Sequence, residues 1–414
     1  MKLAVLGAGL AGVSSAWWLA QAGHEVVVVD RRAGPALETS RANGGHVSVC
    51  QAEPWASPQA LRALRHWLGR AGAPLQLRLS PHQWLWCLRF LWQCRASRFP
   101  VNVRAMVALA KYSRDTLQGL RSQLDLDYDQ STQGILVVYR SAPSLEQAHR
   151  SAALLHDLGV ERRWVERDEI VRLEPALASA TGIVGGEFSA DDETGDAYRF
   201  TQALAEHARA AGVSFRFNTR VNRLVSVNGR VSVAELVEPD GFFRPLHADA
   251  YVLALGSFTP MVTRPLGVAC PVYPAKGYSA TFALRDAAAA PRVGLVDHDA
   301  RIVCARLGDH LRVAGTVEIG NYSRALNTAR CNQLVEHARN LFPSALDFAK
   351  VQFWSGLRPA TPSSVPLIGR TRLRNLYLNT GHGGLGWTFG AGSGRALADL
   401  VSGQTPEVDF PFLD

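Results

Sequence analysis

The chain has 414 residues, of which 47% are hydrophobic and 19% charged, a balance typical of globular proteins that argues against disorder. The net charge of +8 favours contact with anionic surfaces or ligands. The arginines are scattered, however, so a solvated basic surface is the simpler interpretation. No uninterrupted apolar run is long enough to predict a membrane-spanning helix. The length predicts two domains.

The cysteines have neither C-x-x-C spacing nor a zinc-like pairing with histidines, which predicts reduced thiols and no metal site. The first predicted strand begins at Leu3 and leaves no room for a signal peptide, so we expect a cytoplasmic protein. The six cysteines are Cys50, Cys87, Cys94, Cys270, Cys304 and Cys331.

The first thirty residues follow a strand, glycine turn, helix and strand pattern. The first aliphatic run stops at Gly7, and the second ends at Asp30. Gly7 permits the tight turn, Gly9 lets the backbone approach a pyrophosphate, and Gly12 lets the helix pack closely on the strand. This pattern predicts a βαβ dinucleotide-binding unit. The residues expected to contact the cofactor here are Leu6, Gly7, Ala8, Gly9, Leu10, Ala11, Gly12, Asp30 and Arg31.

The carboxylate of Asp30 is expected to accept the hydroxyls of an adenosine ribose. Arg31 and Arg32 follow it directly and could accommodate a 2′-phosphate. This motif alone does not separate FAD from NAD or NADP.

The middle of the chain lacks βαβ alternation and is predicted to be an inserted cap domain. Residues 59–123 have a mostly helical pattern, with breaks near Gly72 to Pro74 and at Pro81. A strand at 134–139, a helix to about 158 and a short helix at 168–173 follow.

Residues 83–94 combine three tryptophans and a phenylalanine with Arg89. Interfacial helices use aromatic and basic residues of this kind. Core packing or a dimer contact uses them too, and we favour that interpretation because the run is short and apolar nearly all round.

Rossmann character returns after residue 200 and leads to Gly256, which is expected at the ligand edge of the nucleotide-binding sheet. The predicted elements are a helix at 200–211 and strands at 213–217, 221–227, 230–237 and 251–255. Strands such as 277–284 and 311–317 are expected to form the sheet of the substrate domain.

The C-terminal section contains a second glycine-rich loop. A strand ends at Thr380, and a helix is expected from about Thr388 to Leu400. A reduced isoalloxazine carries negative charge that a helix N-terminus stabilises, which favours a flavin over a nicotinamide.

These residues resemble the FAD-dependent D-amino-acid dehydrogenases, within the group of D-amino-acid oxidase, glycine oxidase and sarcosine oxidase. The resemblance rests on the N-terminal fingerprint and on five further segments in order. These are Leu37 to Ser48, Asp191 to Asp196, Val272 to Ser279, Trp354 to Pro362 and Asn379 to Thr388.

The resemblance implies α/β plus α+β architecture, with a discontinuous Rossmann-like FAD-binding domain and an inserted, mainly antiparallel substrate-binding domain. The FAD domain is expected to comprise 1–58, 182–262 and 354–414. The substrate domain is expected to comprise 59–181 and 263–353.

The resemblance also implies site residues. Ser40, Asn43 and Gly44 are expected along the flavin, and the backbone of Val221 at the adenine. The residues expected at the pyrimidine edge of the ring are Gly381, Gly383, Gly384, Gly386 and Thr388.

Three side chains are candidates for substrate contact. Arg358 is expected to hold the substrate carboxylate, because a guanidinium forms two parallel charge-assisted bonds; the alternative is a structural salt bridge. Tyr278 is a candidate to cover the substrate, or is a half-buried strand tyrosine. His46 is expected to face the flavin, with a backbone-bonded loop histidine as the alternative.

The implied activity is oxidation of a D-amino acid by hydride transfer from Cα to flavin N5, followed by hydrolysis to a 2-oxo acid and ammonia. The implied electron acceptor is a quinone or another respiratory carrier, with peripheral contact at the cytoplasmic face of the inner membrane. Ser363 and Ser364 replace the Asp-Gly expected after Pro362, which leaves open a D-imino acid, glycine or sarcosine as substrate. Two further interpretations stay open, a basic nucleic-acid-binding flavoprotein and an NADP-dependent reductase.

Overall fold

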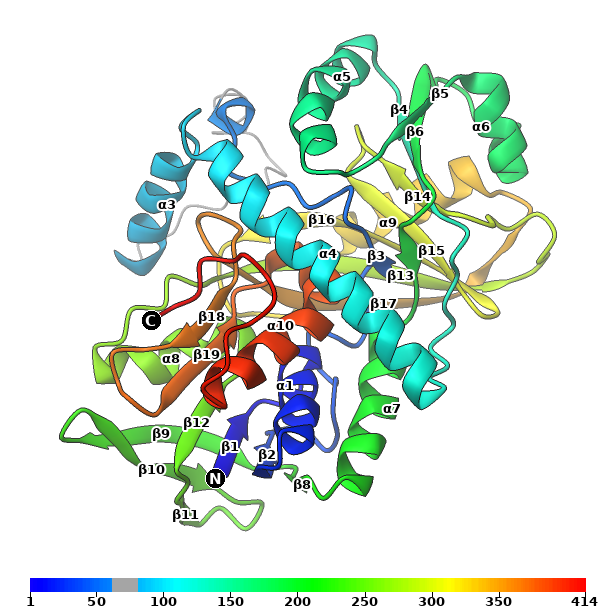
Figure 1. The fold of residues 1–414 in the computed structure, drawn as a ribbon. Coiled ribbons are helices and arrows are strands. Elements are labelled where there is room, and N and C mark those ends of the chain that lie inside the picture. Colours follow the sequence, from blue (N-terminus) through cyan, green and yellow to red (C-terminus); the bar gives the residue numbers. More distant parts are fainter. Residues whose placement is uncertain (62–80) are drawn as a thin grey trace.

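The computed structural model describes residues 1–61 and 81–414 and contains two large sheets with helices packed around them (Figure 1). The six cysteines are all free. No helix within the described ranges is both long and apolar enough to cross a membrane.

The first large sheet has six strands in the order β18-β19-β12-β1-β2-β8. All neighbouring pairs are parallel except β18 with β19. Runs such as Val26 to Val29 are buried, as expected for parallel strands covered on both faces. The strands are β1 (Lys2–Leu6), β2 (Glu25–Val29), β8 (Ser214–Arg216), β12 (Ala250–Leu253), β18 (Leu367–Arg370) and β19 (Leu376–Thr380).

Helices cover one face of this sheet, and a three-stranded antiparallel sheet packs against the other face. The helices are α1 (Leu10–Gln21), α7 (Ala197–Ala210) and α10 (Gly386–Val401), and the strands are β9 (Arg220–Val227), β10 (Arg230–Val237) and β11 (Phe243–Leu246).

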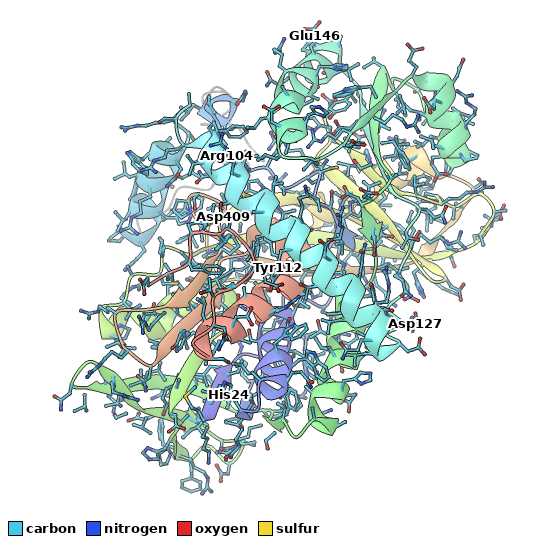
Figure 2. All side chains as sticks on the ribbon, in the orientation of Figure 1. His24, Arg104, Tyr112, Asp127, Glu146 and Asp409 are labelled. Atoms are coloured by element: carbon cyan, nitrogen blue, oxygen red, sulfur yellow. The ribbon has the colours of Figure 1, made fainter. Side chains whose placement is uncertain are left out.

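Helix α4 (Phe99–Leu124) crosses the molecule diagonally, from near Arg104 past Tyr112 toward Asp127 (Figure 2). It packs closely on α10, where the backbone N–H of Gly392 donates to Ser113 Oγ at 2.9 Å. It thus closes the helical layer over α10.

The second large sheet has eight strands in the order β17-β13-β16-β15-β14-β4-β6-β5 and only one parallel pair, β14 with β4. A mainly antiparallel substrate-domain sheet was predicted, and this fold class is confirmed. The strands are β4 (Ile135–Tyr139), β5 (Arg163–Val165), β6 (Gly185–Ser189), β13 (Tyr273–Leu284), β14 (Gly294–Asp297), β15 (Ile302–Leu307), β16 (His310–Ile319) and β17 (Leu346–Ala360). Further elements are α3 (Pro81–Gln93), α5 (Ala142–Asp157), α6 (Arg167–Leu173), α8 (Thr259–Thr263) and α9 (Thr328–Leu341), with the short strands β3 (His46–Val47) and β7 (Glu193–Thr194).

Three elements lie outside the domains expected for them. Strand β6 and the end of β17 belong to the eight-stranded sheet, although 182–262 and 354–414 were assigned to the FAD domain. Helix α4 packs on α10, although 59–181 was assigned to the substrate domain. The two-domain division stays a prediction, and we now place β6 and β17 with the substrate side and α4 with the FAD side. The expected break at Gly72 to Pro74 lies outside the described residues.

The tryptophan-rich segment forms α3, as a helical pattern predicted, but it is not buried all round. Trp86 is buried and packs near Phe90, whereas Trp84 and Trp92 are exposed. The expectation of core packing is therefore wrong for the outer face of this helix, because only one side of it meets the eight-stranded sheet.

Candidate active site

A cavity of about 1330 Å³ lies between the two large sheets. The loops after β1 and β19 both open into it. These strands flank β12 in one parallel sheet, so their carboxyl ends share one edge. The two glycine-rich segments, from opposite ends of the chain, thus converge at one cavity, as the flavin interpretation requires.

The start of α1 is shaped for close approach of a ligand. Gly9 is the N-cap, so the cap residue has no side chain that bonds to the N–H groups of the first turn. A Cβ placed on Gly9 would meet only Ser40 Oγ, at 3.6 Å. Gly7 has φ +112°, and Gly12 packs so closely that a Cβ there would overlap the Gly7 carbonyl oxygen. The N–H of Leu10 donates to Ser40 Oγ at 3.2 Å, and the rest of this helix end offers open space and N–H groups where a phosphate can bind.

The end of β2 carries the predicted acid. Asp30 Oδ2 accepts from the N–H of Ala8 at 2.7 Å, and Oδ1 accepts from the N–H of Arg32 at 2.8 Å. Each oxygen keeps a second lone pair that can accept from a ribose hydroxyl.

Two neighbouring arginines are already paired. Arg31 and Arg32 bond to Glu38 at 2.7 and 2.6 Å. Burial alone would raise the pKa of Glu38, but the two guanidiniums outweigh it and lower the pKa. Because both arginines are engaged, this corner does not favour a 2′-phosphate.

The loop after β2 is clamped against the rest of the cavity wall. Asp192 is buried and accepts from Ser48 Oγ at 2.5 Å and from the N–H of Val49 at 2.9 Å. The hydroxyl of Thr388, at the start of α10, accepts from the N–H of Ser48 at 3.1 Å. The N-terminal loop and the C-terminal helix thus form one continuous wall.

The C-terminal loop turns at Gly381, which has φ +84° and packs against Thr361. His382 is buried, and its Nε2 lies 3.1 Å from Ser393 Oγ. Burial lowers the pKa of His382 to about 4, so the ring is neutral at physiological pH. The loop therefore brings backbone rather than charge to the cavity.

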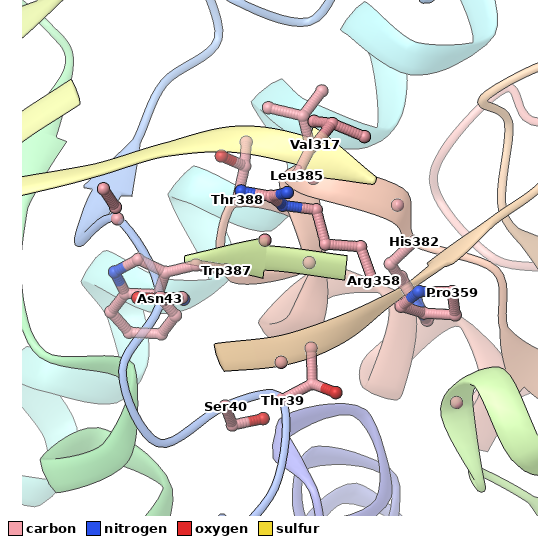
Figure 3. Close-up of a pocket in the computed structure, with 18 of the residues that line it drawn as sticks. Thr39, Ser40, Asn43, Val317, Arg358, Pro359, His382, Leu385, Trp387 and Thr388 are labelled. Atoms are coloured by element: carbon pink, nitrogen blue, oxygen red, sulfur yellow. The ribbon is translucent and has the colours of Figure 1, made fainter. Parts of the chain in front are cut away.

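Arg358 extends from β17 into the pocket, as Figure 3 shows. Its guanidinium lies over Gly277 of β13, where any side chain would clash, and its Nη1 donates to the carbonyl of Thr316 at 3.1 Å. Within the described part of the chain, no acidic side chain forms an ion pair with it. Desolvation lowers the pKa of Arg358 to about 10, so the group stays cationic at neutral pH.

Thr316 itself is strained. Its φ is +55°, in the left-handed region that β-branched residues avoid, and its buried Oγ1 has no hydrogen-bond partner within the described residues. It lines the cavity where the register between β13 and β16 shifts. Strain of this kind concentrates at functional sites. No sequence pattern pointed to this residue.

Tyr278 and His46 are both held by partners within the protein. The Tyr278 hydroxyl donates to Glu318 Oε2 at 2.7 Å, and the ring belongs to the core on the other face of β13 from Arg358. Although the cavity touches Tyr278, its hydroxyl is directed away from Arg358. His46 Nε2 lies 3.0 Å from the Cys304 carbonyl, and burial lowers its pKa to about 4.

Most of the predicted cofactor residues line this cavity, and four do not. Leu6 is a core residue, Ala8 holds Asp30, Gly12 packs on Gly7, and Gly381 shapes the loop. The predicted residues that line the cavity are Gly7, Gly9, Leu10, Ala11, Asp30, Arg31, Ser40, His46, Asn43, Gly44, Val221, Gly256, Tyr278, Arg358, Gly383, Gly384, Gly386 and Thr388. Sequence reasoning missed Glu38, Trp55 and Thr316, which also line it.

A family model described as FAD dependent oxidoreductase matches residues 2–400. The chain belongs to this family. A D-amino acid dehydrogenase of Dechloromonas aromatica is 48% identical over 416 residues, covering 100% of both chains. A D-amino acid dehydrogenase of Paramagnetospirillum magneticum is 48% identical, covering 99% of this chain and 97% of its own.

Solved structures share the fold at low sequence identity. Glycine oxidase of Geobacillus kaustophilus matches with a TM-score of 0.74 and 20% identity over 99% of this chain and 96% of its own. An FAD-bound L-α-glycerophosphate oxidase of Mycoplasma pneumoniae matches with a TM-score of 0.71 and 15% identity over 100% of this chain and 98% of its own.

The cofactor of the family is FAD, and the cavity fits it. The open N-terminus of α1 suits the pyrophosphate, the free lone pairs of Asp30 suit a ribose, and the start of α10 lies at the opposite glycine-rich wall.

Proposed function

We propose that the protein oxidises D-amino acids to imino acids, which water converts to 2-oxo acids and ammonia. The observation that carries this proposal is Arg358. A cation in a cavity wall, bonded to one backbone carbonyl and to no acid among the described residues, is suited to a carboxylate. The named relatives that match the whole chain support the D-amino acid as substrate.

In this proposal Arg358 holds the substrate carboxylate and thereby fixes the orientation of Cα. Thr316 holds the guanidinium through its carbonyl, and Gly277 leaves room for it. FAD held at this site would supply the acceptor for the hydride that leaves Cα.

Acidic side chains that line the cavity have other partners. Asp30 and Glu38 lie at the nucleotide end, while Glu53 and Glu187 pair with Arg162 at 2.9 and 3.4 Å. Three histidines also line the cavity, His46, His298 and His382. Burial lowers the pKa of each, which makes each ring a weaker base, and His46 and His382 are in addition held by a backbone carbonyl and a serine. The substrate amine is therefore expected to react in its neutral form, with its own lone pair driving hydride departure and no protein base required.

We also propose a quinone or related respiratory carrier as the electron acceptor, with the protein at the cytoplasmic face of a membrane. The dehydrogenase names of the relatives and the positive net charge support this proposal.

The test is anaerobic bleaching of the bound flavin by a panel of D-amino acids, their L-enantiomers, D-proline, glycine and sarcosine. We expect D-amino acids with small and medium side chains to bleach the flavin fastest. Faster reduction by D-proline, glycine or sarcosine would replace the proposed substrate class, and no reduction by any member would overturn the proposal.

A further inference from the structure

Helix α3 presents an apolar face to solvent. Its exposed apolar residues follow the i, i+1, i+4, i+7, i+8 spacing of one helical face. Leu88 is 61% exposed, Trp84 46% and Trp92 40%. We call this set the α3 stripe; it comprises Trp84, Leu85, Leu88, Leu91 and Trp92.

The opposite face of α3 is fixed to the protein. Trp86 Nε1 donates to the carbonyl of Ala360 at 2.9 Å, and Gln83 Nε2 donates to that of Ile319 at 3.2 Å. Trp86 also stacks on Phe90 at 5.3 Å. Because these contacts determine which way the helix faces, the outward orientation of the α3 stripe is fixed by the fold.

The surroundings of the α3 stripe are basic. Between Pro81 and Arg114 the chain has six Lys and Arg residues and no Asp or Glu. Arg89 and Arg95 are exposed, and the guanidinium of Arg98 lies 3.9 Å from the ring centre of Trp92. Packing against an apolar protein surface would not require this concentration of cations, whereas tryptophan, leucine and arginine together match the boundary of an anionic lipid layer.

We propose that the α3 stripe docks the protein onto the surface of an anionic membrane. The Trp and Leu side chains enter the boundary between headgroups and acyl chains, while Arg89, Arg95 and Arg98 meet lipid phosphates. Helix α3 lies at the periphery of the molecule, beside the N-terminal part of α4 (Figure 1).

This placement also connects the membrane to the site. Phe90, on the inner side of α3, lines the cavity. Docking through the α3 stripe would bring the cavity within reach of a lipid-soluble acceptor, a consequence that rests on the proposed function.

The test is co-sedimentation of the FAD-loaded protein with vesicles of phosphatidylcholine, with and without 30% phosphatidylglycerol as an anionic lipid. We expect binding to the anionic vesicles that weakens with added salt. The double variant W84Q/L88Q should bind at least about tenfold more weakly, since it removes the two large apolar groups.

The matched control is F242Q/F243Q, which removes two side chains that are 68% and 65% exposed elsewhere on the molecule. It should leave vesicle binding unchanged. Both double variants should keep their flavin content and their reduction of a soluble dye, which would show that they are folded.

Three results would overturn the proposal. These are equal loss of binding in both double variants, equal binding to neutral and anionic vesicles, and a dimer that W84Q/L88Q abolishes without any effect on lipid binding. Because vesicle binding is measured without substrate, failure of the proposed catalytic function would leave this test intact.

Discussion

Removal of the Arg358 side chain tests the proposed carboxylate site most directly. A hydrogen bond to a charged group contributes about 1.5–3 kcal/mol. Two parallel bonds would then contribute about 3–6 kcal/mol, which corresponds to roughly a 10²- to 10⁴-fold loss of kcat/KM in Arg358→Met. Arg358→Lys keeps the charge but loses the planar fork, so it should lose about half of that free energy.

The assay is anaerobic flavin reduction by a D-amino acid at varied concentration, with binding of a non-reactive carboxylate followed by the flavin spectrum. FAD content should be unchanged, because Arg358 lies on the substrate-domain sheet. Arg223→Gln is the control, since its exposed pair with Glu235 contributes little. Unchanged KM and unchanged carboxylate binding in Arg358→Met would refute the carboxylate role.

The same side chain predicts a pH dependence. Desolvation lowers the pKa of Arg358 to about 10, so the cation is present below that pH and is lost above it. Carboxylate binding should therefore be constant from neutral pH to about 9 and weaken above 10. Because a bound carboxylate stabilises the cation, saturating ligand should move this loss to higher pH. Weakening of binding between pH 7 and 9 would contradict the assignment.

Three further substitutions have distinct expected outcomes. Gly12→Ala places a Cβ against the Gly7 carbonyl, so the variant should contain little FAD and lose about 1–3 kcal/mol of stability. The control Gly119→Ala, at an exposed helical position, should be stabilising by about 1 kcal/mol. Equal flavin content in the two variants would contradict the packing argument. Thr316→Val removes an unpaired buried hydroxyl and should not lower the melting temperature, but should raise KM up to about tenfold if the substrate bonds to that hydroxyl, with Thr316→Ser restoring it; an unchanged KM would remove this role. Asp192→Ala frees Ser48 and the N–H of Val49, and should weaken FAD retention in gel filtration; full retention would show that the clamp is not needed.

Local elements were predictable because their signals are local. The expected helix at 200–211 is α7 (Ala197–Ala210), and the expected strands at 221–227 and 230–237 are β9 and β10. Apolar periodicity and the turn glycines Gly7 and Gly212 act within a few residues along the chain, so their effect can be predicted without knowledge of the tertiary contacts.

The candidate site was only partly predictable. Arg358 was found through the motif around it, but its lack of an acidic partner among the described residues depends on β13 and β16. The side of the sheet toward which Tyr278 points depends on strand register, since successive residues of a strand point to opposite sides. Thr316 gave no signal, because an unpaired hydroxyl and a positive φ arise only where β16 meets β13 out of register.

The sequence by itself determined the βαβ unit, the glycines that shape it and the order of the strands along the chain, since these follow from side-chain size and apolar period. Only the tertiary structure decided that β1 and β19 flank β12, that the apolar face of α3 points outward, and that Arg358 meets a carbonyl instead of a carboxylate. These outcomes depend on which distant segments pair and in which register. The free energy that selects one pairing is shared among many long-range contacts, and no single stretch of sequence contains them.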